Sequence, residues 1–336
     1  MTSCHRFSCL VLLLPALHAE VHRVIATGYH HTFSRSHPVL ARVRPGDTVI
    51  TKTVDSAGFD YQGVRRTKTH GNPLTGPFYV EGAEPGDALV VHLRQVRLNR
   101  TTGYSAYRIG LAALTPEYVE TIYPNRYKED VVLPGRADLV PWAIDLERQT
   151  VRPKDPVGAR VPLEFAARPM LGCIGVAPAG DFSPTSGPAG SYGGNLDYNE
   201  MREGATVYLP VYHPGGLLFL GDGHALQGDG EPVGSGVETS LDVEFTVEVR
   251  KKGQITEPRL ETAEFLVSIG SQPEFSSSLD RALRIATTDM VRWLMNDYHL
   301  EAPAAHLLIG YQARYDVVTV AGSMALKIPK RYLPAR

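Results

Sequence analysis

A short turn-and-strand unit recurs along this chain and restricts the folds open to it. Arg44-Pro-Gly-Asp47 comes directly before the run Thr48–Val54, and Glu84-Pro-Gly-Asp87 comes directly before Ala88–Leu93. Proline presets φ for a turn and glycine supplies a positive φ, so each unit predicts a tight turn that leads into a β-strand. We therefore interpret both aspartates as part of the architecture.

Further short runs rich in β-branched and aromatic residues extend this pattern. Thr206–Tyr212 and Val243–Val249 are two of them, and the second alternates as a strand does when one face is buried and the other is wet. The 32 glycines and 25 prolines interrupt such runs at short intervals, which is typical of sandwiches and barrels. The sequence thus predicts a mainly β protein with a β-sandwich or barrel-like core.

Amino-acid composition and predicted secondary structure change along the chain after residue 20. We interpret 20–265 as a β-rich catalytic region and 99–165, where Pro, Tyr and scattered charges gather, as a segment inserted over the core. Residues 266–336 predict a C-terminal α+β segment.

Its first element is an amphipathic helix over Ser278–Leu300, with its Met and Trp side chains in the core. Ser277 and Asp280 resemble a capping box at its start. A short helix after Pro303 and a strand near 315–320 complete the predicted C-terminal segment.

The first 19 residues resemble a secretory signal. They have a weakly basic start, the apolar run Phe7–Leu14 and a small residue, Ala19, where cleavage could occur. The run is shorter than the about 20 residues that a membrane span needs, and no later segment qualifies. We expect a secreted or periplasmic protein without a membrane span in the mature chain; an uncleaved anchor or a misassigned start codon are the alternatives.

Charge and cysteine content make several partners and catalytic nucleophiles less favoured. The formal net charge of −2 does not favour nucleic acid or an anionic membrane as a partner. Cys4 and Cys9 lie in the leader, so the mature chain keeps only Cys173 and cannot form an intrachain disulfide. The apolar setting of Cys173 disfavours a thiolate nucleophile, and the absence of a Gly-x-Ser-x-Gly elbow disfavours a serine hydrolase.

The densest group of chemically active side chains is Gly221-Asp-Gly-His-Ala-Leu-Gln-Gly-Asp-Gly-Glu231. Carboxylate oxygens and an imidazole are ligands of divalent metals, and glycines let the backbone bend close around an ion. Asp222, His224 and Glu231 are therefore candidate metal or catalytic residues. A solvated turn whose aspartates close Asx-turns is the structural alternative.

Other acidic or amide-bearing side chains lie near predicted strand ends and could join this group. They are Asp55, Asn72, Glu81, Asn195 and Asp197. If they converge, the site combines many oxygens with one imidazole, a set that suits zinc, calcium or a mid-row metal. Glu81 as a turn cap and Asn195 as a left-handed bend residue are the structural alternatives. His30, His31 and His70 are weaker candidates, and an exposed turn explains His30 and His31 better.

Five stretches together resemble the acetamidase/formamidase family, and they follow the family's order over most of the mature chain. They are 72–77 with 80–87, 175–178, 193–197, 221–231 and 325–329. The resemblance implies a β-rich fold, a homo-oligomer, and hydrolysis of short aliphatic amides such as formamide or acetamide to acid and ammonia. It also implies a divalent metal, with zinc as the first choice and calcium as the alternative.

The resemblance also implies roles for single residues. It implies Asp55, Asp197, Asp222 and His224 as metal ligands, with His224 also catalytic. Glu81 would be the acid/base, with Glu231 as the second choice. Asn195 and Asn72 would bind the substrate, and Asn195 could stabilise the oxyanion. Near Asp55 the chain lacks the Gly-Gln ending of the family pattern, and this departure over 54–60 bears on which amide is hydrolysed.

Two other functions stay open at this point. A secreted binding module could use the same metal loop to hold a sugar or a peptide without turnover. A hydrolase of a larger amide would fit the altered stretch Ser56–Asp60.

Overall fold

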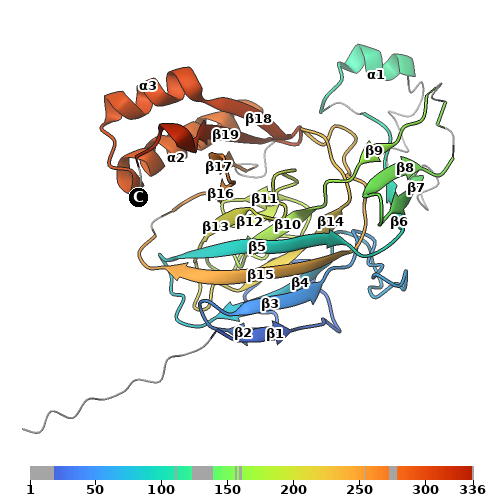
Figure 1. Ribbon diagram of the computed structural model, residues 1–336, viewed down its shortest axis with the longest axis horizontal. Helices are drawn as coiled ribbons and strands as arrows, with labels where there is room; N and C mark the ends of the chain where they lie inside the picture. The colour runs from blue at the N-terminus through green and yellow to red at the C-terminus, as the bar shows by residue number, and fades with distance from the viewer. Residues whose placement is uncertain are drawn as a thin grey trace, which may run out of the picture.

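The computed structural model describes residues 19–109, 112–122, 139–155, 157–158, 161–253, 255–271 and 278–334. Within these ranges the chain forms three β-sheets and three α-helices (Figure 1). The prediction of a mainly β fold with a C-terminal α+β segment is confirmed. Except for Ala19, the predicted leader lies outside the described residues. No helix in the described ranges is both long and apolar enough to cross a membrane.

A six-stranded sheet carries most of the candidate site. Its order is β11 (Ala189–Gly190), β12 (Gly193–Asn195), β10 (Met170–Val176), β14 (Leu218–His224), β4 (Leu74–Val80) and β2 (Ala41–Val43). All residues of the two central strands, β10 and β14, are buried. Backbone pairing sets Cys173 of β10 opposite both Gly221 and Asn195, so residues far apart in sequence meet at this sheet.

A nine-stranded sheet packs against the first and forms the other half of the core. Its order is β1 (Val21–Arg23), β3 (Thr48–Lys52), β15 (Leu241–Arg250), β5 (Ala88–Leu98), β13 (Thr206–Pro210), β16 (Arg259–Glu261), β17 (Phe265–Gly270), β19 (Ser323–Pro329) and β18 (Arg314–Thr319). Phe78 of the first sheet meets Phe245 of the second edge to face, with ring centroids 5.3 Å apart. The four strands expected from alternation and β-branched content are all in this sheet, with shifted ends.

The predicted turn aspartates, Asp47 and Asp87, stabilise the turns that lead into two of these strands. Asp47 accepts hydrogen bonds from the backbone N–H groups of Arg44 and Glu20, both at 2.9 Å. Asp87 accepts from the N–H groups of Glu84 and Lys252 at the same distance. Their architectural interpretation is therefore confirmed.

The third sheet lies inside the segment that the sequence marks as an insertion. It consists of β6 (Thr102–Ser105), β7 (Val140–Asp145), β8 (Thr150–Pro153) and β9 (Phe165–Ala166), and helix α1 (Pro116–Ile122) lies in the same segment. Figure 1 shows these strands as a lobe to one side of the two large sheets. Tyr104 of β6 forms an isolated backbone bridge to Glu238, which joins this lobe to the candidate site.

The C-terminal segment adds α2 (Leu279–Asp297), α3 (Ala302–Gln312) and the 3₁₀ turn η3 (Lys330–Tyr332). Ser278, not Ser277, caps α2: its side chain accepts a hydrogen bond from the N–H of Arg281. Ser277 lies outside the described residues. Met290 and Trp293 are fully buried, as predicted. The strands of this segment continue the nine-stranded sheet rather than forming a separate unit.

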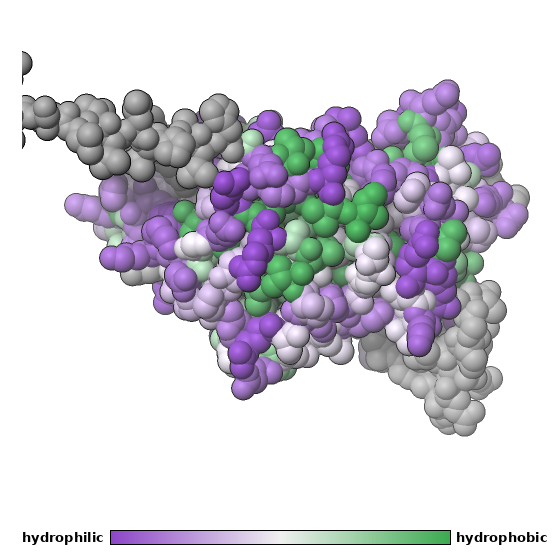
Figure 2. All heavy atoms as spheres, turned by 90° about the horizontal axis from the view of Figure 1, so that it is seen from below, coloured by the Kyte–Doolittle hydropathy of each residue, from purple (hydrophilic) through white to green (hydrophobic). Residues whose placement is uncertain are grey.

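Two short strands, β1 and β2, each form one edge of a large sheet. Figure 2 views the molecule from below, the side where β1 and β2 lie in Figure 1, and shows apolar side chains among polar ones. Val21, Ile25 and Val39 are exposed apolar residues in or beside these strands. Both edge strands have only three residues, which limits the backbone available for pairing with another chain.

Candidate active site

Four carboxylates and one imidazole converge where β12 and β14 end. Ligand atoms of Asp197, His224 and Glu231 lie within 4.8 Å of one another, and those of Asp222, His224 and Glu238 do the same. His224 belongs to both groups. It is 1% exposed, and Asp222, Asp197 and Glu238 are at most 4% exposed. Such a concentration of ionisable groups away from solvent needs a counter-charge.

Glycines beside the cluster leave the space that its side chains occupy. A Cβ on Gly172 of β10 would lie 2.6 Å from Oδ1 of Asp197 and 2.8 Å from Oδ2 of Asp222. A Cβ on Gly236 would lie 2.5 Å from the ring of His224. Asp222 and His224 are two residues apart on one strand, so their side chains leave the sheet on the same face. The glycine-rich local sequence thus builds the cavity around the ligand atoms.

Unusual backbone conformations gather at this site. In the described ranges, eight non-glycine residues have a positive φ, and four of them are site residues. These four are Asn72 (52°), Asp197 (48°), Asp222 (53°) and Glu231 (46°). Residues other than glycine visit this region rarely, and such conformations concentrate at functional sites.

Gln227 fixes which nitrogen of His224 is available. Nδ1 of His224 lies 2.8 Å from Oε1 of Gln227, and Nε2 of Gln227 donates to the backbone carbonyl of Asp197 at 2.6 Å. Because Oε1 can only accept, Nδ1 must carry the proton. In the neutral imidazole, Nε2 then presents its lone pair to the carboxylates, the arrangement that a metal ligand requires.

The inward-facing atoms of the cluster lack hydrogen-bond partners. Nε2 of His224 lies 3.1 Å from Oε1 of Glu238 and 3.7 Å from Oδ1 of Asp222, but makes no hydrogen bond. Oδ1 of Asp197, Oδ1 of Asp222 and Oε2 of Glu238 are also unpartnered. Buried polar atoms are nearly always satisfied, so four orphans at one point fit a divalent cation.

The electrostatics agree with this interpretation. Burial, and then the charge of Asp222, raises the pKa of Asp197 to about 8; burial raises that of Glu238 to about 7. Burial and the charge of Asp197 hold the pKa of Glu231 well above its usual value. Burial lowers the pKa of His224, but the charges of Glu238 and Asp222 outweigh it and raise this pKa well above its ordinary value. Without a bound cation, protons on these carboxylates neutralise part of the negative charge of the cluster.

Two amide side chains and a thiol lie beside the carboxylates. Oδ1 of Asn195 accepts hydrogen bonds from Nδ2 of Asn72 at 3.2 Å and from Sγ of Cys173 at 2.9 Å. Nδ2 of Asn195 donates to Asp197. Both asparagines are partly exposed, whereas Cys173 is buried. Burial and the nearby carboxylates raise the pKa of the Cys173 thiol well above normal, so a thiolate is disfavoured, as the sequence indicated.

Two residues expected at the site do not join it. Glu81 is exposed and follows the end of β4 opposite to Leu74, the residue that pairs with Gly221. At about 3.3 Å per residue, Glu81 lies roughly 20 Å from Leu74 along the strand. This corrects its assignment as the acid/base. Asp55 is buried, but Oδ2 pairs with Arg100 at 2.7 Å and Oδ1 accepts from the N–H groups of Ala57 and Phe59. This corrects its assignment as a metal ligand.

The sequence patterns did not indicate two residues that the structure places at the cluster, Glu238 and Gln227. Gln227 lies within the glycine-rich motif, between His224 and Glu231, but its side chain suggested no metal ligand. Glu238 lies seven residues beyond the motif and enters the site through backbone bridges to His224 and Tyr104. Only the paired strands reveal those bridges.

The weaker histidine candidates lie outside the ligand cluster. His30 stacks on His37, with ring centroids 3.8 Å apart, and Nδ1 of His31 lies 3.1 Å from the carbonyl of Gly71. His70 is exposed. His31 therefore lies near the Asn72 side of the site, without contributing to either group of ligand atoms.

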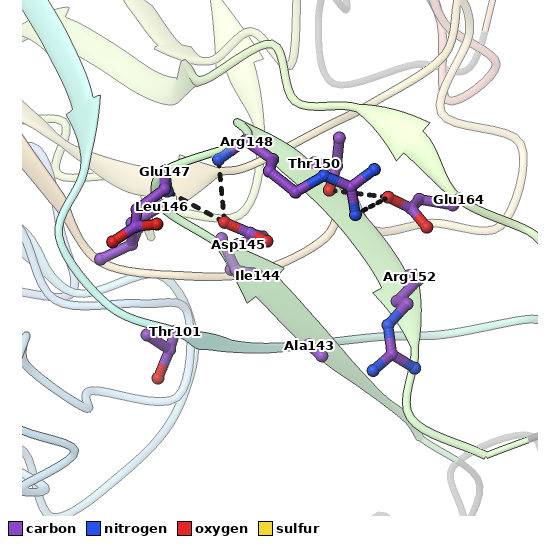
Figure 3. Close-up of a pocket in the computed structure, with 10 residues that line it drawn as sticks. All are labelled: Thr101, Ala143, Ile144, Asp145, Leu146, Glu147, Arg148, Thr150, Arg152 and Glu164. Atoms are coloured by element: carbon purple, nitrogen blue, oxygen red, sulfur yellow. Dashed lines mark hydrogen bonds and ion pairs between the residues drawn. The ribbon is translucent and has the colours of Figure 1, made fainter.

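A separate hollow at the turn between β7 and β8 does not involve the cluster (Figure 3). Arg148 pairs there with Glu164 at 3.1 Å, and Asp145 accepts hydrogen bonds from the turn N–H groups of Glu147 and Arg148. Arg148 and Glu164 thus neutralise one another, whereas the carboxylates of the cluster have unpartnered inward-facing atoms.

Comparison with known proteins finds similarity to one family. The family model described as the acetamidase/formamidase family matches residues 20–186 and 183–295. The formamidase of Methylophilus methylotrophus is 29% identical over 241 residues, covering 60% of this chain and 59% of the relative. The acetamidase of Mycolicibacterium smegmatis is 26% identical over 266 residues, 64% of each protein. The chain matches about three-fifths of the length of these curated relatives.

Solved structures match over more of the chain. A predicted acetamidase/formamidase from Thermoanaerobacter tengcongensis has a TM-score of 0.74 and 30% identity, covering 93% of this chain and 96% of that one. The acetamidase of Bacillus halodurans has a TM-score of 0.72 and 28% identity, covering 92% and 98%. A γ-lactamase from Delftia acidovorans, with a TM-score of 0.55 and 19% identity, shares the fold alone. Because the family model covers most of its length, this chain belongs to the acetamidase/formamidase family.

Proposed function

We propose that this protein hydrolyses short aliphatic amides, such as formamide or acetamide, to a carboxylic acid and ammonia. Relatives named formamidase and acetamidase support the reaction class. The observation that carries the proposal is the buried group of four carboxylates around one imidazole with its unpartnered, inward-facing atoms.

A divalent cation is part of this proposal, and Asp197, Asp222 and His224 are the residues that would hold it. The imidazole favours zinc over calcium, because calcium prefers oxygen ligands alone. When bound, the ion supplies a Lewis acid that polarises the amide carbonyl and lowers the pKa of water.

Each of the two groups also contains one glutamate, Glu231 or Glu238, and these two carboxylates are left for proton transfer. Amide hydrolysis needs a group that accepts a proton from water and gives it to the departing nitrogen. Glu238 is the better placed, because its backbone is paired on both sides and its Oε2 has no partner. Glu231 lies in a half-buried loop with left-handed backbone.

Asn72 and Asn195 would orient the substrate at the mouth of the site. Their amide groups can donate to a carbonyl oxygen and accept from an amide nitrogen. They are partly exposed while the ligand residues behind them are almost wholly buried, so a small amide meets them first. This layering suits a substrate with little bulk beyond the amide.

A larger amide is a second candidate, and one observation favours it. The stretch Ser56–Asp60, which departs from the family pattern, lies at the rim of the site. The carbonyl of Ser56 accepts hydrogen bonds from the N–H groups of Gly71 and Asn72, at 3.0 and 3.2 Å. A different loop beside a substrate-binding residue could admit a different substituent.

The test is ammonia release by purified, metal-replete protein from a panel of amides of increasing size, with two matched variants. Glu238→Gln keeps the shape of the side chain but removes the acid/base, so turnover should fall about 100-fold or more while metal content is retained. Glu81→Gln, at an exposed and distant position, should match the wild type. Absence of ammonia from every short amide, or equal losses in both variants, would contradict the proposal.

A further inference from the structure

We propose that Asn195 is a positioning residue for Asp197. Its side-chain amide fixes which carboxylate oxygen of Asp197 is left for a cation, and Cys173 and Asn72 in turn fix the amide. The inference rests on the role proposed above for Asp197 as a metal ligand. It also gives a role to the buried thiol of Cys173, which takes no part in the proposed hydrolysis.

Strand pairing places Cys173 and Asn195 side by side. Cys173 of β10 and Asn195 of β12 are opposite each other in an antiparallel pair, and side chains at opposite positions lie on the same face of a sheet. The two chain segments stay paired beyond the end of β12, where the N–H of Asp197 donates to the carbonyl of Gly172 at 3.1 Å. The backbone therefore fixes where the side chains of Cys173, Asn195 and Asp197 begin.

The oxygen of the Asn195 amide is held by two donors. Oδ1 accepts from Sγ of Cys173 at 2.9 Å and from Nδ2 of Asn72 at 3.2 Å. The thiol has one hydrogen, and its other acceptors are farther away: the carbonyl of Ser186 at 3.5 Å and Oδ2 of Asp222 at 3.9 Å. Because an amide oxygen has two lone pairs, these two bonds use the full accepting capacity of Asn195.

The NH₂ group of the same amide is thereby directed at Asp197. Nδ2 of Asn195 donates a hydrogen bond to Oδ2 of Asp197. A reversed amide would set its oxygen against this carboxylate and its NH₂ group against the NH₂ group of Asn72. Both of those contacts are unfavourable, since the first joins two acceptors and the second joins two donors. The hydrogen bonds therefore allow one orientation of the Asn195 amide.

The bond from Asn195 makes the two oxygens of Asp197 unequal. Oδ2 has a hydrogen-bond partner, whereas Oδ1 is buried and has none. Groups that hydrogen-bond a ligating carboxylate orient it, and their loss typically weakens metal binding by about 10- to 100-fold. Oδ1 is therefore the oxygen of Asp197 that is left for a cation, and Asn195 keeps it so.

The same bonds limit what Asn195 can offer a substrate. Both lone pairs of its Oδ1 are in use and one hydrogen of its Nδ2 is directed at Asp197, so one N–H remains. Asn195 can then donate to the carbonyl oxygen of an amide but cannot accept from the amide nitrogen. Loss of Asn195 could thus affect the substrate as well as Asp197, and zinc affinity isolates the effect on Asp197 because no substrate is needed to measure it.

The experiment equilibrates zinc-loaded protein with graded concentrations of a zinc chelator, which gives the Kd for zinc. Asn195→Ala should raise this Kd by about 10- to 100-fold, because the Asp197 carboxylate loses the bond that orients it. Cys173→Ala should raise it by about 3- to 10-fold, since a thiol is a weak donor and Asn72 still holds the amide. Cys173→Ser keeps one donor at the same position and should lie within about twofold of the wild type.

A double variant tests whether the thiol acts through the amide. Asn195→Ala combined with Cys173→Ala should have the Kd of Asn195→Ala alone, because the thiol has nothing to orient once the amide is gone. Two independent effects would multiply instead. A crystal structure of zinc-loaded Asn195→Ala gives a second readout, and it should show the Asp197 carboxylate rotated or in more than one conformer.

Asn199→Ala is the matched control. Nδ2 of Asn199 donates to Oδ1 of Asp229 at 2.6 Å, so this variant also removes a bond from an amide to a carboxylate close to the site. Asp229 belongs to neither group of candidate ligand atoms among the described residues. The control should therefore keep the wild-type Kd for zinc.

The possible outcomes separate this inference from the proposed function. If the wild type binds zinc and releases ammonia while Asn195→Ala keeps the wild-type Kd, the positioning role is overturned and the function stands. If the wild type binds zinc but releases no ammonia, the proposed hydrolysis fails and the zinc affinities still decide the positioning role. If the wild type releases ammonia without binding zinc, the ligand role of Asp197 is wrong and the inference falls with it.

The Cys173 variants decide the remaining cases. If Cys173→Ala weakens zinc binding more than Asn195→Ala does, or if the two losses multiply in the double variant, the thiol does not act through Asn195 and the inference fails. Should Asn195→Ala not fold, a wild-type Kd for Cys173→Ala overturns the inference. A loss in Cys173→Ala that Cys173→Ser restores supports it.

Discussion

At the scale of single residues, the site depends on where side chains are absent as much as on where they are present. Gly172 leaves room for two carboxylates, and Gln227 fixes the proton on His224. The sequence motif of residues 221–231 indicated Asp222 and His224 as candidate site residues, and the structure places both in one buried group. It could not indicate the role of Gly172, because nothing in the sequence shows that β10 lies against those carboxylates.

Gly172→Ala tests this packing at the residue scale. Its Cβ would lie 2.6 Å from Oδ1 of Asp197 and 2.8 Å from Oδ2 of Asp222, too close for either oxygen to stay in place. We expect bound metal and ammonia release to fall by about 10-fold or more, since displaced ligands weaken metal sites to that degree. Gly228→Ala, where an added Cβ meets nothing within 4 Å, is the control and should keep both. Equal metal content in the two variants would refute the packing argument.

At the scale of elements, the course of the strands explains why Glu81 lies away from the cluster and why Glu238 joins it. Asn72 and Glu81 are close in sequence, yet β4 separates them, so only Asn72 reaches the site. Glu238 is distant from the motif in sequence, yet bridges to β6 and β14 bring it in. Alternation and turn chemistry predicted most strands of the nine-stranded sheet, but their order depends on pairings between distant segments, which local patterns do not encode.

The packing of α2 against the nine-stranded sheet should make stability depend on pH through Glu257. Burial, then the charge of Asp289, raises the pKa of Glu257 to about 8. Between its ordinary value near 4.5 and 8, the folded protein therefore holds a proton that the unfolded chain has released. The stability contributed by this group is present below pH 4.5 and is lost as the pH rises through 8.

Glu257→Gln removes this dependence. At pH 9 the variant should exceed the wild type in free energy of unfolding by about 1–3 kcal/mol, whereas near pH 4.5 the two should differ little. Urea unfolding of both proteins at several pH values measures the difference. A difference that stays constant from pH 5 to pH 9 would show that Glu257 is not protonated in the folded state.

At the scale of the whole molecule, the site forms where three sheets meet. The six-stranded sheet supplies Asp222 and His224, and the bend that follows β12 supplies Asp197. The segment that leads into β15 of the nine-stranded sheet supplies Glu238, and the four-stranded sheet holds Glu238 through Tyr104. The motifs spread over the chain were enough to identify the family and the fold class. The homo-oligomer implied by that resemblance stays a prediction.

The central claim is that this meeting point is one metal-dependent amidase site. The most direct measurement is ammonia release from formamide and acetamide while metal-free protein is titrated with zinc and the bound metal is quantified. We predict that activity rises in proportion to bound metal and stops rising when the site is full. Full activity without bound metal, or no ammonia at full occupancy, would contradict the claim.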